Sequence, residues 1–189
     1  AAFSIQIREP SAITGGLKWQ RDVACFGDSS AYISLNASGG HGNYLFTADS
    51  LTFSSDSTLY NLPAGAYNTI ILDDSSCYIS FPVTIAEPPL LTSVVQDRSH
   101  ISCFGLNNGS IALTTNGGVA PYNFSFDGSP FAPDSSFANL GPGNYMLTAQ
   151  DDSACMVDIP VTILEPDTLV LAVVEQINVA CNGDSSAKI

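Results

Sequence analysis

Residues 61–88 read NLPAGAYNTIILDDSSCYISFPVTIAEP, and residues 139–166 read NLGPGNYMLTAQDDSACMVDIPVTILEP. Apolar side chains alternate with polar ones from Ile79 to Ile85, and again from Val157 to Ile163. Alternation with a period of two is typical of a β-strand that buries one face. Both stretches therefore predict a closing β-strand that ends at a Glu-Pro dipeptide.

Two further features of these stretches indicate sandwich structure. Leu62-x-x-Gly65-x-Tyr67 resembles the tyrosine corner of immunoglobulin-like sandwiches, in which a Tyr hydroxyl donates to upstream backbone, and Tyr145 stands in the same pattern. Asp73-Asp74-Ser75-Ser76 lies between two alternating runs, as does Asp151-Asp152-Ser153-Ala154. We expect these segments to be the turns of the last hairpins.

The rest of the chain repeats in the same register. Cys25, Cys103 and Cys181 recur at a spacing of 78 residues, and the pairs Gly39-Gly40 and Gly117-Gly118 follow the same spacing. A unit of this length can bury a core by itself, unlike the shorter modules of solenoids. The sequence predicts two complete repeats, with a piece of another repeat on either side.

The predicted boundaries follow from the Glu-Pro dipeptides. Residues 11–88 and 89–166 are the complete repeats, 1–10 the last strand of a preceding repeat, and 167–189 the first strands of a following one. Turn-forming residues punctuate each repeat every eight to twelve residues, and no window carries a helical apolar stripe. The predicted fold is all-β: tandem immunoglobulin-like sandwiches of about seven strands each.

Composition excludes several classes of function. The chain has 189 residues, 5 Lys and Arg against 18 Asp and Glu, and a net charge of −13. Such a charge repels phosphate backbones and anionic lipid head groups, so neither nucleic acid nor a membrane surface is an expected partner. No run of 18 apolar residues predicts a transmembrane helix, and the first ten residues lack the pattern of a signal peptide.

The order of the motifs resembles the SprB repeat. The motifs are Cys-x-Gly, a β run, Gly-Gly, Pro121-Tyr122, Asn-Leu-x-x-Gly-x-Tyr, Asp-Asp-x-x-Cys and Val-Thr-Ile-x-Glu-Pro. Asn43 replaces the Pro before Tyr44, and Phe46 and Phe124 stand at an aromatic position that is often Trp in the family. The resemblance implies a module of a large surface adhesin of gliding Bacteroidetes, exported by the type IX secretion system and displayed outside a Gram-negative cell.

The cysteines predict a structural disulfide, because each complete repeat carries two at fixed places and an oxidising compartment favours their pairing. The simplest pairing is Cys25 with Cys77 and Cys103 with Cys155, all buried, with the partner of Cys181 outside the chain. A sandwich, however, places its first strand end and its last hairpin at opposite ends, which is farther than a disulfide spans. Pairing of Cys25 with Cys155 across the repeats, pairing of Cys77 with Cys103, and free thiols all remain open.

The sequence offers few candidate residues for a catalytic or metal site. His41 and His100 do not recur between the repeats, so we expect surface loop residues and no enzyme. Without Cys-x-x-Cys or a nearby His pair, zinc is not expected. A weaker alternative is Ca²⁺ bound at a repeat junction by oxygen ligands from the following set. The set is Asp73, Asp74, Asp151, Asp152 and Glu87.

Two further expectations concern the surface. The resemblance implies O-glycosylation at Asp-Ser/Thr motifs, which gives Ser50, Ser57, Ser153 and Thr168 as acceptors. Trp19 has no equivalent in the other repeat, and we expect it to pack at a junction.

Two functions fit these observations. The first is a structural stalk segment of a long adhesin filament linked to adhesion and gliding, whose partners are the neighbouring repeats and other filament chains. The second is a β-sandwich module whose loops bind surface polysaccharide or another partner.

Overall fold

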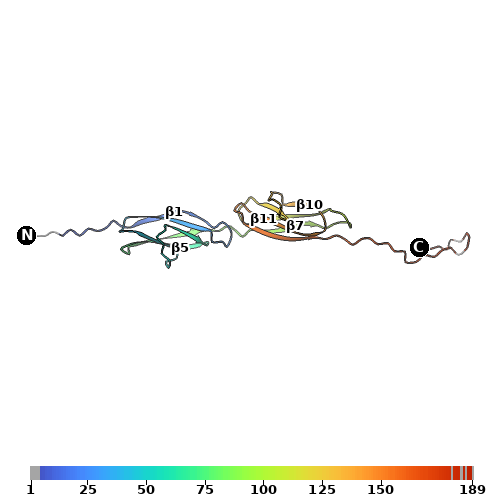
Figure 1. The fold of residues 1–189 in the computed structure, drawn as a ribbon, viewed down its shortest axis with the longest axis horizontal. Coiled ribbons are helices and arrows are strands. Elements are labelled where there is room, and N and C mark those ends of the chain that lie inside the picture. Colours follow the sequence, from blue (N-terminus) through green and yellow to red (C-terminus); the bar gives the residue numbers. More distant parts are fainter. Residues whose placement is uncertain (1–4, 180, 184, 186, 189) are drawn as a thin grey trace, which may run out of the picture.

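The computed structural model describes residues 5–179, 181–183, 185, 187 and 188. Within them every named element is a β-strand, and the strands form two sandwiches that follow one another along the chain. Figure 1 shows the two sandwiches end to end, with the N-terminal segment leaving one and the C-terminal segment the other. No helix in the described part of the chain is long and apolar enough to cross a membrane.

The first sandwich consists of two three-stranded antiparallel sheets. One sheet has the order β1-β2-β4 and the other β3-β5-β6. The strands are β1 (Thr14–Arg21), β2 (Ala31–Ser38), β3 (Tyr44–Thr47), β4 (Thr58–Leu62), β5 (Gly65–Asp73) and β6 (Tyr78–Ile85).

The second sandwich repeats this arrangement. Its sheets have the orders β7-β8-β10 and β9-β11-β12. The strands are β7 (Thr92–Ser99), β8 (Gly109–Asn116), β9 (Asn123–Phe126), β10 (Ser136–Leu140), β11 (Gly143–Gln150) and β12 (Met156–Ile163).

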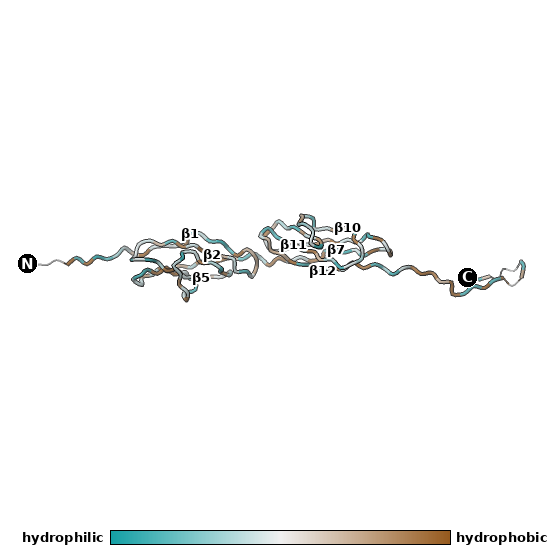
Figure 2. Tube along the Cα trace, in the orientation of Figure 1, coloured by the Kyte–Doolittle hydropathy of each residue, from teal (hydrophilic) through white to brown (hydrophobic). Residues whose placement is uncertain are grey.

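The alternation in the sequence determines which side chains fill the two cores. Ile33 and Leu35 of β2 and Ile71 of β5 are buried between the first pair of sheets. Ile111, Leu113 and Ala149 take the corresponding places in the second. Figure 2 shows hydrophilic and hydrophobic residues mixed along the chain in both sandwiches. Each core is a separate cluster, so each sandwich has its own hydrophobic centre.

The expected seventh strand is absent from both sandwiches among the described residues. Its place is taken by a single bridge, Phe46 to Ser54 in the first and Phe124 to Ala132 in the second. Between residues 49 and 58, Asp and Ser side chains accept hydrogen bonds from nearby backbone N–H groups. These local bonds favour turns over a strand ladder, which explains why six strands form and not seven.

The flanking segments were expected to contribute strands, and their described residues form none. Residues 5–13 and 164–176 have no ladder, and the only bridge recorded beyond β12 in the described segments joins Ile177 to Lys188. A strand requires a hydrogen-bonded neighbour, and the described residues provide none for these segments. Residues 1–4 of the predicted preceding strand lie outside the described residues.

Candidate functional site

The candidate site is the junction between the sandwiches, where two ends of different character meet. We call the end with residues 22–30 (100–108 in the second sandwich) the loop end. The end with the turn between β5 and β6 (β11 and β12 in the second) is the hairpin end. The loop end of the first sandwich faces the hairpin end of the second in Figure 1.

The loop end presents a cysteine on a short turn that the linker glutamate holds in place. The N–H of Asp28 donates to the Cys25 carbonyl at 3.1 Å, and Gly27, at φ +74°, supplies the left-handed conformation that the turn requires. The Gly27 N–H donates to Oε2 of Glu87 at 2.7 Å. The equivalent bond in the second sandwich joins Gly105 to Glu165 at 3.1 Å. The Glu of each Glu-Pro dipeptide therefore fastens the Cys-Phe-Gly turn.

The hairpin end is organised by one buried carboxylate. Oδ1 of Asp151 accepts the N–H groups of Ser153 and Cys155, and Oδ2 accepts that of Val119, all at 2.9 Å. The side chain is only 2 % exposed. Asp151 thus joins the hairpin turn to the loop that follows β8, and it fixes the backbone that carries Cys155.

Asp73 performs the same role in the first sandwich. Burial opposes its ionisation, but the N–H groups of Cys77, His41 and Ser75 outweigh burial and lower its pKa. The two hairpin turns were predicted correctly. Asp73 and Asp151, at which these turns begin, also accept hydrogen bonds from backbone N–H groups. The Gly-Gly motif and the hairpin Asp recur together in both repeats. This recurrence was the sequence signal that the Asp side chain binds the loop that contains Gly-Gly.

The two glycines of the Gly-Gly motif are required because the linker backbone and the Asp151 carboxylate lie very close to them. A Cβ on Gly117 would lie 1.9 Å from the Leu90 carbonyl oxygen, and one on Gly118 would lie 2.5 Å from Oδ2 of Asp151. Both residues also have positive φ. The loop is held from the other side by Tyr122, whose hydroxyl donates to the Gly117 carbonyl at 2.6 Å. Only glycine fits between the linker and the carboxylate.

The tyrosine corner is present in both sandwiches. The hydroxyl of Tyr67 donates to the Pro63 carbonyl at 2.7 Å, and that of Tyr145 to the Gly141 carbonyl at 2.9 Å. Each bond closes the connection between the two sheets, and this prediction is confirmed.

A disulfide joins the two sandwiches. Cys25, on the loop end of the first, is bonded to Cys155, on the hairpin end of the second, with their Cα atoms 5.7 Å apart and 130 residues apart in sequence. The simplest predicted pairing, Cys25 with Cys77, is therefore wrong, and so is Cys103 with Cys155. Within one sandwich the two cysteines occupy opposite ends, so only a neighbouring sandwich brings a partner within reach.

The expected burial of all four cysteines is also wrong. Cys77 and Cys103 are exposed free thiols, as is Cys181 in the C-terminal segment. Cys77 follows the hairpin turn, before the inward-facing positions of β6 begin, so the parity of the strand does not extend to it. Cys77 nevertheless has the backbone setting of Cys155, and Cys103 has that of Cys25.

The two histidines lie at opposite ends of their sandwiches. His41 lies in the loop after β2 at the hairpin end, where its N–H donates to Asp73. His100 lies at the loop end, and its Nδ1 accepts the N–H of Leu164 at 3.0 Å. In the first sandwich Asp22 accepts the corresponding N–H, that of Ala86, at 3.1 Å. His100 is thus a hydrogen-bond acceptor of the loop end.

The structure gives the calcium alternative no support. Asp73 and Asp151 direct both carboxylate oxygens at backbone N–H groups, Glu87 binds Gly27, and Oδ2 of Asp74 accepts the N–H of Asn43. Asp152 is exposed beside the hairpin turn. Among the described residues, no three His, Cys, Asp or Glu side chains gather as a metal cluster.

The predicted glycosylation sites are scattered. Ser50 is exposed in the loop after β3, and Thr168 is exposed in the C-terminal segment. Ser57 and Ser153 are half-buried in turns, where the Ser57 carbonyl accepts from Leu35 and the Ser153 N–H donates to Asp151. Modification at these four residues stays a prediction.

Two solved structures of other proteins are similar to this chain. The fibronectin(III)-like modules of Clostridium thermocellum CbhA match with 17 % identity and a TM-score of 0.37, over 80 % of this chain and 94 % of that one. The C-terminal fragment of intimin, solved in complex with the intimin-binding domain of its translocated receptor, matches with 13 % identity and a TM-score of 0.40. That match covers 82 % of this chain and 64 % of the intimin complex chain. No curated protein matches the chain.

The family comparison gives a direct match. The model of the SprB repeat matches residues 20–52 and 96–131, which together make up less than half of the chain. Each segment runs from the end of the first strand of a sandwich, through the Cys-x-Gly turn and the Gly-Gly loop, into the region after the third strand. Each sandwich therefore contains one segment that matches the SprB repeat.

Proposed function

We propose that this chain is a force-resisting segment of the stalk of an extracellular adhesin, in which disulfides between neighbouring sandwiches carry tension. The observation that supports the proposal best is the bond between Cys25 and Cys155. A disulfide inside one sandwich would stabilise that sandwich alone. A disulfide between sandwiches transmits tension from one sandwich to the next through a covalent bond.

The bond shortens the covalent path from one end of the chain to the other. Tension that enters through β1 reaches Cys25, crosses to Cys155 and leaves through β12, so the residues between the two cysteines are bypassed. If both sandwiches unfold, those residues form a slack loop and cannot be extended. In such a stalk, the residues between the two cysteines add no length to the chain under tension, even when both sandwiches unfold.

The linker limits bending as well. Its Glu87 accepts the N–H of Gly27 in the first sandwich, and its Pro89 carbonyl accepts the N–H of Gly118 in the second at 2.8 Å. Two linker residues, two positions apart, are thus bonded one to each sandwich. Pro88 and Pro89 further restrict the backbone that precedes them. The linker and the disulfide together attach the two modules at more than one point.

The same bonding extends to further neighbours in this proposal. Cys77 is exposed on the free hairpin end and Cys103 on the free loop end. Because their backbone settings match those of Cys155 and Cys25, we assign them to bonds with a preceding and a following sandwich. Cys181 would take the same role in the repeat that we predict from residue 167 onward.

The cellular setting is part of the proposal. The SprB repeat and the sandwich fold fit a cell-surface module, and a disulfide fits an oxidising, extracellular compartment. Gliding motility, type IX secretion, a Gram-negative cell and the absence of catalysis complete the proposal. Its partners are neighbouring repeats and other filament chains.

Single-molecule force spectroscopy tests the mechanical role. The chain is pulled from its two ends after Cys77, Cys103 and Cys181 are changed to Ser, so that Cys25 and Cys155 are the remaining cysteines. Reduction should lengthen the fully unfolded chain by about 470 Å, the extended length of the 130-residue loop. The Cys155→Ser variant should show the longer length without reductant. Equal lengths with and without reductant would contradict the proposal.

A further inference from the structure

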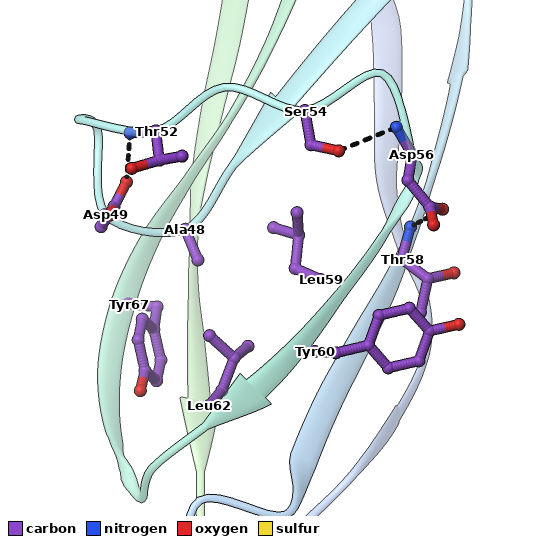
Figure 3. Close-up of a pocket in the computed structure, with 10 residues that line it drawn as sticks. All are labelled: Ala48, Asp49, Thr52, Ser54, Asp56, Thr58, Leu59, Tyr60, Leu62 and Tyr67. Carbon is purple, nitrogen blue, oxygen red and sulfur yellow. Dashed lines mark hydrogen bonds between the residues drawn. The ribbon is translucent and has the colours of Figure 1, made fainter.

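The first sandwich has a hollow at its β4 edge. Its volume is about 350 Å³, which is within the range of small-ligand sites. Figure 3 shows Ala48, Leu59 and Leu62 facing its interior, with Tyr67 at one side. The bulge at Asn61, where φ is +57°, turns Leu62 to the same side as Leu59. The floor is therefore apolar and belongs to the edge of the core.

The hollow exists because one aromatic ring is missing. In the second sandwich Phe126 occupies the position of Ala48, and its ring lies 5.1 Å from that of Phe137 and 5.0 Å from that of Tyr145. Phe137 and Tyr145 are the counterparts of Leu59 and Tyr67. A ring thus fills this place in one sandwich, and the other leaves space for a ring-sized group.

The rim of the hollow is richer in hydroxyl groups than its counterpart. Thr52, Ser54 and Thr58 line it, where the second sandwich has Pro130, Ala132 and Ser136. Asp49 and Asp56 lie on opposite sides of the rim in Figure 3.

Both carboxylates keep an oxygen for a ligand. Within the described residues, the side-chain hydrogen bonds of Asp49 and Asp56 all use Oδ1, so Oδ2 of each stays available. The N–H groups of Thr52 and Leu51, with the Thr47 hydroxyl, lower the pKa of Asp49 to about 2. Asp49 is therefore ionised across the physiological pH range.

A strip of aromatic rings leads to the hollow across the outer face of the β1-β2-β4 sheet. Trp19 lies 4.9 Å from Tyr32, and Tyr32 lies 5.8 Å from Tyr60, between ring centroids. Trp19 is 43 % exposed and Tyr60, which also lines the hollow, 58 %. The expectation that Trp19 packs at the junction is therefore wrong, because its ring lies on the outer face of the sheet and meets Tyr32 of the adjacent strand edge to face.

The strip is specific to the first sandwich. The second sandwich has Asp97, Ser110 and Ala138 at the three corresponding positions. Fold maintenance does not require the aromatic residues, because the second sandwich builds the same sheet without them. Exposed aromatic residues in a row are costly in contact with water unless something covers them.

We propose that the hollow at the β4 edge and the strip Trp19, Tyr32 and Tyr60 form a binding surface for a neutral glycan, with one sugar ring in the hollow. A pyranose has the size of the missing ring, apolar C–H faces that pack on aromatic rings, and hydroxyl groups for Asp49, Asp56 and the rim hydroxyls. The carboxylates and the net charge of −13 disfavour an acidic polysaccharide. This binding does not depend on the stalk role.

Titration of the ¹⁵N-labelled chain followed by NMR tests the proposal. The probes are cellohexaose, mannohexaose, maltohexaose and galactohexaose, each to about 10 mM, a concentration that detects weak binding. Hexagalacturonate serves as the anionic probe, and a neutral peptide containing Phe serves as the aromatic one. We expect at least one neutral hexasaccharide to shift the amides of Ala48, Leu59 and Tyr60, and hexagalacturonate to shift none of them.

Variants that adopt the residues of the second sandwich locate the site. Ala48→Phe fills the hollow and Tyr60→Ala shortens the strip, and each should weaken binding at least about tenfold, or about 1.4 kcal/mol. Tyr78→Ala is the matched control, because Tyr78 is 64 % exposed on the other sheet, and its binding should be unchanged. Absence of binding by every neutral probe, binding by the peptide alone, or wild-type affinity in Ala48→Phe would overturn the proposal.

Discussion

The two sandwiches share the hairpin Asp and the corner Tyr that bind backbone groups, and they differ in the side chains that fill the β4 edge. Asp73 and Asp151 accept the same set of backbone N–H groups, and Tyr67 and Tyr145 close the same connection. Ala48 and Phe126, in contrast, occupy the same place with very different volumes. The comparison teaches that the hydrogen-bonded frame holds the fold, which leaves the β4 edge free to change. The predictions below test this division.

The largest expected effect comes from the Gly-Gly loop. Gly117→Ala should destabilise the second sandwich by about 4 kcal/mol, because the new Cβ would meet the Leu90 carbonyl and φ is positive. Gly128→Ala is the control, since φ is also positive but no atom lies within 4 Å, and it should cost about 1 kcal/mol. Hydrogen exchange of the β8 and β11 amides measures both. Equal costs would remove the close approach as the cause.

The buried carboxylate comes next. Asp151→Ala should destabilise the second sandwich by about 3 kcal/mol, because the N–H groups of Val119, Ser153 and Cys155 lose their acceptor. Asp152→Ala, at the exposed neighbouring position, should change stability by less than about 0.5 kcal/mol. Trp19 belongs to the first sandwich alone, so its fluorescence in urea should not change with either variant. A shared shift would mean that the sandwiches unfold as one unit.

Exchanging the residues of the β4 edge should have a smaller, asymmetric effect. Phe126→Ala should destabilise the second sandwich by about 2 kcal/mol, because its half-buried ring contacts Phe137 and Tyr145. Ala48→Phe should raise the stability of the first sandwich by up to about 1 kcal/mol, since the ring enters existing space. Urea unfolding measures both. A destabilising Ala48→Phe would show that the hollow does not have the shape of a ring.

The smallest effect concerns pH in the first sandwich. The folded-state pKa of Asp49 is about 2, below its ordinary value of 3.8, and that of Asp73 is lowered too. Their stabilisation is therefore complete above about pH 4 and is lost as the pH falls towards 2. The urea midpoint reported by Trp19 should drop over this range, and Asp49→Asn should flatten the drop. An unchanged pH dependence in Asp49→Asn would exclude this carboxylate as a source.

Sequence reasoning predicted the sandwich fold well because its signals are local. The alternation from Ile79 to Ile85, the Asp73-Asp74 turn and the tyrosine corner at Tyr67 each depend on neighbouring residues, and the structure contains all three. The predicted seventh strand failed because hydrogen bonds made by Asp49 and Asp56 favour turns. Local propensity did not reveal that competition.

The site was harder to predict because it depends on contacts between distant residues. Cys25 and Cys155 meet only after two sandwiches fold and stack, so their pairing could be named as an alternative but not chosen. The hollow at Ala48 is visible only in comparison with Phe126, and Trp19 gave no sign of its neighbour Tyr32 until the strands were paired. Placing the two repeats side by side, position by position, was the signal that could have found the strip.

The central claim is that covalent bonds join sandwich to sandwich. A peptide map of the oxidised chain without reductant, read by mass spectrometry, tests it most directly. The account predicts one linked pair of peptides that contain Cys25 and Cys155. A linked pair of Cys25 with Cys77, or a free thiol at Cys25 and Cys155, would contradict it.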